Sequence, residues 1–228
     1  MGLPVSRWAG LAALLVLGLP LSACSTPPAG SVSAAELVPE IQSAANTATS
    51  VHVSGSMKHG AQTATIDVSI DGNSVAGFLG AYRTRFYVLS LNGDSFVKLN
   101  AAFLNLEGAP AALCARICGK YVELPAASAL QITGFLSMQQ LVNEVFDTGN
   151  MGAAAHSGCT FSPASVNGQA VLQCRQGDAT LDVAAHGRPY LVYWSGPHGQ
   201  HLAFSDWNSV VLPAAPPTSE VVSTSNLG

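Results

Sequence analysis

Apolar and polar residues alternate over many short stretches of the chain, which is typical of β-strands with one buried face. Ile66, Val68 and Ile70 follow the strictest alternation. Asn92-Gly93 and Asn167-Gly168 each separate two such stretches, and this residue pair favours a two-residue hairpin turn. The pattern therefore predicts mainly antiparallel strands, at residues 51–57, 66–70, 75–79, 84–91, 95–99, 120–124, 160–166, 169–174, 180–184, 190–194, 201–204 and 210–212.

An amphipathic helix is expected to precede the first of these strands. Ser33 and Glu36 have the spacing of a capping box, so the helix begins here. Pro39 lies inside it, and a start near Val38 is the alternative because proline interrupts helical hydrogen bonding. The helix is expected to end before Ser50. Its apolar face holds Leu37, Ile41, Ala44 or Ala45, and Ala48.

A second helix is expected between Thr133, as its capping residue, and Gly149. Its apolar stripe contains Phe135, Met138, Leu141, Val142, Val145 and Phe146. Residues 101–119 are rich in Ala and Leu and predict a short helical turn. Many short strands with few helices indicate an α+β fold with an antiparallel sheet.

The N-terminal residues have the pattern of a secretory signal peptide. Arg7 precedes an apolar run, Trp8 to Leu19, which is too short to span a bilayer comfortably. Leu21-Ser22-Ala23-Cys24 follows and resembles the bacterial lipobox, in which the chain is cut before a Cys whose thiol is acylated. A signal peptide with Cys24 near the cut site by chance is the alternative. The pattern predicts a lipid anchor on Cys24 that holds the protein on the extracytoplasmic face of the cell membrane.

Four segments are expected on this basis. Residues 1–23 form the lipoprotein signal peptide, and residues 24–32 the acylated Cys and a flexible tether. Residues 33–215 form a single domain, and residues 216–228 a polar, disordered tail.

The four cysteines after Cys24 predict two disulfides, because an even number in an exported chain is typical of a disulfide framework. Three connectivities are possible. Pairing of Cys114 with Cys118 and of Cys159 with Cys174 is favoured, the second pair because it brackets a hairpin turn. Zinc binding at the first pair is the alternative, but no His lies close to it in sequence.

Composition and motifs argue against several function classes. The formal net charge of −4 and the scattered Lys and Arg residues do not favour nucleic-acid binding. Tyr193-Trp194-Ser195-Gly196 lacks the first glycine of a nucleophile elbow, and His198 and His201 fit solvated turn positions better than a metal site. The sequence contains no phosphate-binding or dinucleotide-binding loop and no evident carboxylate pair. We therefore expect a binding protein without enzymatic activity, cofactor or metal.

The last third of the chain resembles actinobacterial lipoproteins of the LppX/LprAFG family. The resemblance spans about Ser50 to Pro217, and short motifs carry it: Asn167-Gly168-Gln169-Ala170, Thr180-Leu181-Asp182-Val183, Gly187-Arg188-Pro189-Tyr190-Leu191, Phe204-Ser205-Asp206-Trp207-Asn208, Ala215-Pro216-Pro217, Ser50-Val51-His52-Val53-Ser54-Gly55 and Phe96-Val97-Lys98-Leu99. Members look like LolA-type carriers. The resemblance implies a strongly curved antiparallel half-barrel with helices over its concave face, and an apolar cavity for acyl chains between them.

Two functions follow as hypotheses. One is a membrane-anchored lipoprotein that binds, and transfers, lipids or glycolipids of the envelope. The other is an anchored interaction module with a filled core, whose partner is an envelope protein or polymer. The aromatic and aliphatic residues expected to line the cavity, or to fill it, are Phe86, Phe96, Phe103, Phe135, Met138, Leu141, Val142, Val145 and Phe146.

Overall fold

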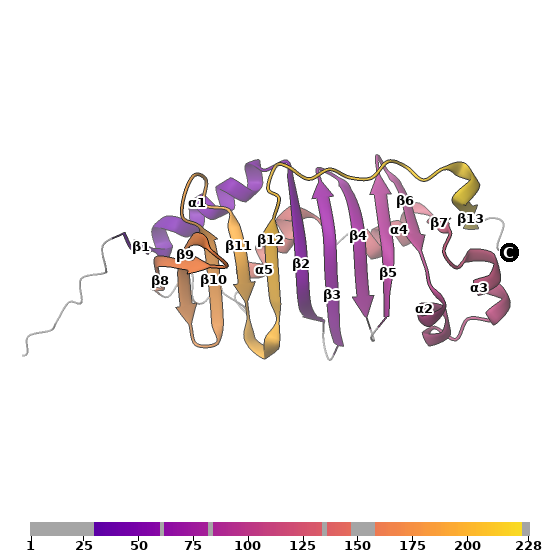
Figure 1. Cartoon of the computed structure of the whole chain (residues 1–228), viewed down its shortest axis with the longest axis horizontal. Coiled ribbons are helices and arrows are strands. Elements are labelled where there is room, and N and C mark those ends of the chain that lie inside the picture. The colour runs from indigo at the N-terminus through magenta and orange to yellow at the C-terminus, as the bar shows by residue number, and fades with distance from the viewer. Residues whose placement is uncertain (1–29, 60–61, 82–83, 134–135, 147–157, 225–228) are drawn as a thin grey trace, which may run out of the picture.

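The computed structural model describes residues 30–59, 62–81, 84–133, 136–146 and 158–224. Within them, thirteen strands form one open sheet of the α+β class, antiparallel except for its last pair (Figure 1). The predicted signal peptide, Cys24, Phe135 and Gly149 lie outside the described residues. The strands are β1 (Val32–Ser33), β2 (Ser50–His59), β3 (Gln62–Asp71), β4 (Ser74–Ala81), β5 (Thr84–Leu91), β6 (Asp94–Lys98), β7 (Tyr121–Glu123), β8 (Thr160–Val166), β9 (Gln169–Gln176), β10 (Ala179–Ala184), β11 (Leu191–Ser195), β12 (His201–Ser205) and β13 (Val221–Ser223).

The sheet joins two runs, β2 to β7 and β8 to β12, in which each strand pairs with the next one in sequence. Its order is β1-β8-β9-β10-β11-β12-β2-β3-β4-β5-β6-β7-β13. The two runs meet where β12 pairs with β2, with Phe204 opposite Val53. Asn92 and Gly93 have the positive φ angles, 53° and 99°, of the hairpin turn that their sequence predicts. Most neighbouring strands are therefore consecutive in sequence, whereas β12 with β2, β1 with β8 and β13 with β7 are long-range pairings.

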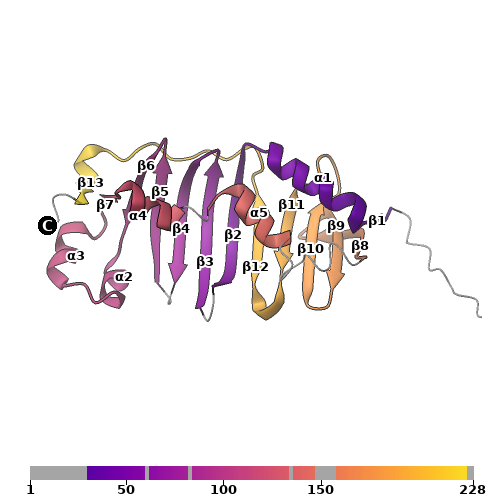
Figure 2. The same cartoon turned by 180° about the vertical axis from the view of Figure 1, so that it is seen from behind.

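Helices α1 (Ala34–Thr47), α4 (Ala126–Thr133) and α5 (Met138–Phe146) cover one face of the sheet (Figure 2). We call this the helix-covered face and its opposite the helix-free face. Helices α2 (Ala101–Leu106) and α3 (Ala111–Ile117) lie at the end of the sheet near β6 and β7, where the sequence predicted one short helical turn (Figure 1). In the described part of the chain, no helix is long and apolar enough to cross a membrane.

The start of α1 agrees with its predicted capping box. Ser33 and Glu36 exchange the expected contacts, and the helix includes Pro39 instead of starting near Val38. Pro39 and Ala35 are both on the exposed side of the helix, so water can hydrogen-bond the carbonyl that proline leaves unpaired.

The second predicted helix begins later than expected, at Met138, and another helix precedes it. Thr133 is the last residue of α4 and is not an N-cap. Ser137 caps α5 instead, because its Oγ accepts a hydrogen bond from the Gln140 N–H at 3.1 Å. The apolar stretch 126–133 forms a helix of its own directly after Pro125, a residue suited to a helix start.

The end of the chain also differs from the sequence prediction. Residues 210–212, expected as a strand, belong to an irregular segment that runs along one end of β2 to β6 (Figure 1). Beyond Pro216, where a disordered tail was predicted, Val221–Ser223 form β13, which pairs in parallel with β7. Likewise Val32, expected in the tether, pairs with Phe161 in β1. These pieces are two or three residues long, too short to show a periodic pattern, and the neighbouring strand edge orders them.

Two glycines allow neighbouring strands to pack closely in the middle of the sheet. Gly55 and Gly77 have φ angles of 149° and 153°, which other residues rarely adopt. A Cβ at Gly77 would collide with the Asp67 carbonyl on β3, and one at Gly55 with the His201 carbonyl on β12. Glycine within a strand commonly marks a bend or a close backbone approach.

Candidate functional site

The apolar stripe of α5 is packed against the sheet on the helix-covered face. Leu141 and Val145 are 3% and 0% exposed, and Val142 and Phe146 are also buried. They belong to one hydrophobic core with residues from the central strands, such as Val53. In this structure, therefore, the stripe occupies the space where the sequence predicted a cavity.

Three of the remaining predicted cavity residues, Met138, Phe86 and Phe103, are partly buried and pack against the same core as this stripe. Met138 is partly buried at the start of α5. Phe86 and Phe103 contact each other near α2, with ring centroids 4.9 Å apart. Phe96 lies on the helix-free face, because its neighbour Val97 points into the core and side chains alternate along a strand. The sheet thus separates Phe96 from the other predicted lining residues.

One polar group is buried without a partner on the helix-covered face. The Trp194 side chain is fully buried, and within the described residues its Nε1–H has no hydrogen-bond acceptor. An unpaired buried donor costs about 1–3 kcal/mol. A ligand carbonyl that reached this position would recover that cost.

The four cysteines after Cys24 form the two favoured disulfides, Cys114–Cys118 and Cys159–Cys174. The first closes the end of α3. The second joins the start of the β8–β9 hairpin to β9, and the Cys159 carbonyl accepts a hydrogen bond from Ala34 at the start of α1. Among the described residues, no group of three or more His, Cys, Asp or Glu side chains could hold a metal ion.

The helix-free face carries a polar cluster with the residue types of a hydrolase triad. His52 Nε2 lies 3.2 Å from Asp67 Oδ1, and its Nδ1 lies 3.1 Å from Ser69 Oγ. Catalysis by such a triad also needs free N–H donors to stabilise an oxyanion. β2 and β3 each pair with strands on both sides, so their N–H groups are used within the sheet. The cluster is therefore best explained as cross-strand hydrogen bonding.

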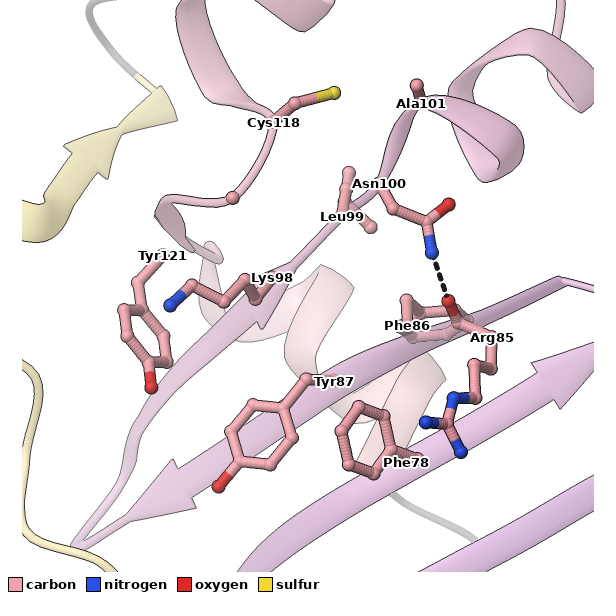
Figure 3. A pocket seen from close by; sticks show the side chains of 11 residues that line it. Phe78, Arg85, Phe86, Tyr87, Lys98, Leu99, Asn100, Ala101, Cys118 and Tyr121 are labelled. Atoms are coloured by element: carbon pink, nitrogen blue, oxygen red, sulfur yellow. Dashed lines mark hydrogen bonds between the residues drawn. The ribbon is translucent and has the colours of Figure 1, made fainter.

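An open groove of about 600 Å³ lies near the β7 end of the sheet (Figure 3). Its floor is aromatic: Phe78 and Tyr87 on β4 and β5 pack edge to face at 5.2 Å, and Tyr121 on β7 lies 6.3 Å from Tyr87. Figure 3 shows these three rings on the same side of the strands. Phe78 is 36% exposed, so part of this apolar surface faces solvent.

Two cations flank the aromatic floor. The Arg85 guanidinium lies 4.4 Å from the centre of the Phe78 ring, and Lys98 Nζ lies 4.3 Å from the centre of Tyr121. Lys98 also forms a long ion pair, 3.9 Å, with Glu220. These cation–π contacts hold both positive groups at the groove.

Hydrogen bonds connect the residues that form the wall of the groove, Asn100 and Gly119, to β5 and to the residue after β6. Asn100 donates a hydrogen bond from Nδ2 to the Arg85 carbonyl at 2.6 Å, and its Oδ1 caps α2 at Phe103. Gly119, next to Cys118, donates its N–H to the Leu99 carbonyl. The groove is thus a built feature of the fold.

Burial raises the pKa of two side chains, Tyr87 and Asp182. Burial, and secondarily the neighbouring Tyr121, raises the pKa of Tyr87 above its ordinary value of 10.0, so its hydroxyl remains a donor at neutral pH. Burial raises the pKa of Asp182 on β10 above 3.8, opposed by a hydrogen bond from Gln173 and the charge of Arg175.

Comparisons with known proteins give similarities to solved structures alone. No family model matches the chain, and no curated protein matches it. One similarity is to the crystal structure of the Mycobacterium tuberculosis lipoprotein LppX, with 16% sequence identity and a TM-score of 0.47. The alignment covers 78% of this chain and 97% of the LppX chain. Another is to a chain in the structure of the Pseudomonas aeruginosa MucA/MucB complex, with 13% sequence identity and a TM-score of 0.30. The alignment covers 82% of this chain and 59% of that chain. Membership of the LppX/LprAFG family remains a prediction from the sequence.

Sequence reasoning named one lining residue of the groove, Phe86, and missed the others. Tyr87 and Tyr121 lie on strands more than thirty positions apart in sequence and become neighbours only because β5, β6 and β7 pair in succession. The available signal was the outward position of both tyrosines in their strands, which helps little without the strand order.

Proposed function

We propose that this protein is a lipoprotein of the cell envelope, anchored through Cys24, that binds the acyl chains of a lipid or glycolipid between its sheet and α5. The observation that carries the proposal is the stripe on α5. A nine-residue amphipathic helix covers the wide apolar face of the central strands, with its polar side outward. A short helix of this kind is held mainly by packing, so a competing apolar ligand can replace it.

Magnitudes support a reversible exchange. Burying a sixteen-carbon acyl chain contributes roughly 12 kcal/mol at about 0.8 kcal/mol per methylene. Exposing the four buried side chains of α5 costs roughly 6–12 kcal/mol at about 1.5–3 kcal/mol each. Because the two quantities are similar, binding can be favourable without becoming irreversible, which a carrier requires. The unpaired Trp194 Nε1–H offers one polar contact for an ester carbonyl.

Native mass spectrometry of the full chain, purified from its own host and released from mild detergent, tests this proposal. We expect a co-purifying amphiphile beyond the covalent anchor. Val145→Trp should abolish it, because the larger side chain blocks the space beneath α5. Gln139→Trp, which adds the same ring on the exposed side of α5, is the matched control and should retain the ligand.

The second candidate is an interaction module with a filled core. The nearly complete burial of Leu141 and Val145 favours it, because the core is closed without any ligand. A protein that carries no amphiphile and exchanges no fluorescent phospholipid between vesicles, in wild-type form and in both variants, would contradict the carrier and leave the module.

A further inference from the structure

We propose that the groove on the helix-free face is a second binding site, whose ligand is an anionic saccharide: a sugar ring carrying a phosphate or carboxylate. The site is lined by Phe78, Tyr87 and Tyr121 and flanked by Arg85 and Lys98. Its aromatic floor and both cations lie on the opposite side of the sheet from α5, whereas Phe86 and Leu99, which also line the groove, pack against the hydrophobic core.

The floor of the groove fits the apolar face of a sugar. Three ring side chains form a continuous strip, and the partly exposed Phe78 ring and the Tyr87 hydroxyl give it both apolar and polar contact points. C–H groups on one face of a sugar ring pack on aromatic surface, and the hydroxyls remain free for Tyr, Asn and water. The volume of about 600 Å³ falls within the usual range of small-molecule sites, about 300–1,000 Å³.

The openness of the groove argues against hydrocarbon as the ligand. An acyl chain lying here would keep much of its surface in water and gain little from burial. A saccharide tolerates this position because its outer hydroxyls stay hydrated. The same geometry that makes the α5 side suitable for acyl chains thus makes this side suitable for a polar ligand.

The positive charges at the groove favour a saccharide that carries an anionic group. The chain has a formal net charge of −4, yet the groove carries two cations. In the described part of the chain, no carboxylate lies within ion-pair distance of Arg85. Lys98 Nζ pairs with the Glu220 carboxylate at 3.9 Å. This long separation leaves the ammonium available to an anion that comes closer.

Titration of the full chain in a polyoxyethylene detergent, followed by NMR or calorimetry, tests the proposal with glucose 6-phosphate, methyl glucoside and inorganic phosphate as probes. We expect glucose 6-phosphate to bind about tenfold or more tightly than either of the others, since it alone offers both a sugar ring to the aromatic floor and an anion to the two cations. The affinity should fall as salt rises, because the anion pairs with partly exposed cations.

Variants distinguish the contribution of the two cations from that of the aromatic floor. Arg85→Gln with Lys98→Gln should remove the preference for the phosphorylated sugar, and Glu220→Gln should strengthen its binding. Tyr121→Ala should weaken both sugars, and Tyr87→Phe, which keeps the packing of the ring, should remove only the hydroxyl contact.

Matched controls lie on the same face outside the groove. Lys58→Gln removes an exposed cation from β2, and Tyr193→Ala removes a tyrosine from β11; neither should alter binding. Equal binding of inorganic phosphate would indicate a bare anion site and overturn the proposal. So would the absence of saccharide binding, equal losses in the control variants, or groove-dependent binding to phosphatidylglycerol vesicles in place of the sugar.

Discussion

At the scale of residues, the close contacts in the middle of the sheet depend on two glycines. Gly77 has a φ of 153° and faces the Asp67 carbonyl, whereas Gly72, in the β3–β4 turn, has a φ of 55° and open space where a Cβ would be. Both positions use the conformational freedom of glycine, but only Gly77 also lacks room. The two residues therefore allow backbone strain and steric collision to be compared.

Gly77→Ala should destabilise the protein more than Gly72→Ala. The backbone conformation alone costs about 1–3 kcal/mol, and at Gly77 the collision with β3 adds to it. Urea unfolding of the two variants measures the difference in unfolding free energy. Equal losses would show that the neighbouring strand adjusts without cost.

Asp182 is a second residue whose environment has a measurable consequence. Its side chain is 2% exposed, and Gln173 donates a hydrogen bond to it at 2.7 Å. Because burial raises its pKa, the folded state binds the proton more tightly than the unfolded chain does. This contribution to stability is fully present below the unfolded-state pKa, near 3.8, and is lost as the pH rises through the folded-state pKa.

Asp182→Asn should therefore make the unfolding free energy depend less on pH. The amide oxygen can still accept the hydrogen bond from Gln173, but the side chain no longer ionises. Unfolding free energies from pH 3 to 7 should converge at the acidic end and favour the variant at the neutral end. Asp178→Asn, at an exposed turn position, is the control and should leave the profile unchanged.

At the scale of elements, the two disulfides close loops of different length. Cys159 and Cys174 are 15 positions apart, and Cys114 and Cys118 are 4 apart. The longer loop loses more entropy when it closes in the unfolded chain. The hairpin it staples also supports the start of α1, since Ala34 donates to the Cys159 carbonyl.

Replacing Cys159 and Cys174 together with Ala should lower the unfolding free energy by about 3 kcal/mol, against about 2 kcal/mol for Cys114 and Cys118. Urea unfolding under non-reducing conditions gives both values. Loss of the shorter disulfide should also weaken binding of glucose 6-phosphate, because Cys118 lines the groove. A larger loss of stability for the shorter loop would contradict the entropic explanation.

At the scale of the whole molecule, the sheet places two different surfaces back to back. One face is covered by α1, α4 and α5 (Figure 2) and is apolar. The other is polar over β2 and β3 and aromatic near β7. A protein anchored at its N-terminal end can then present one face to a lipid and the other to a hydrated partner. The proposed anchor, Cys24, lies outside the described residues, eight positions before the first residue of β1.

Cys24→Ala should release the protein from the membrane. Without the thiol the chain cannot be acylated, and the sequence contains no later apolar run long enough to replace the anchor. Detergent partitioning and mass spectrometry of the N-terminal peptide measure the change. Wild-type protein without a lipid adduct, or a variant that stays membrane-bound, would refute the anchor.

The sequence by itself determined the local structure. Alternation placed Ile66, Val68 and Ile70 on one face, and Asn92-Gly93 and Asn167-Gly168 set their hairpins, because side-chain period and turn conformation depend on neighbouring residues. The capping box at Ser33 and the cysteine pairs followed from short spacings for the same reason.

Tertiary structure decided the rest. The pairing of β12 with β2 joins residues about 150 positions apart, and β13 forms only because β7 offers a free edge. Whether a side chain such as Phe96 lies on the helix-covered or the helix-free face depends on register, and a shift of one residue reverses it. The site that results, with Tyr87 beside Tyr121, is a property of strand order, which no local pattern encodes.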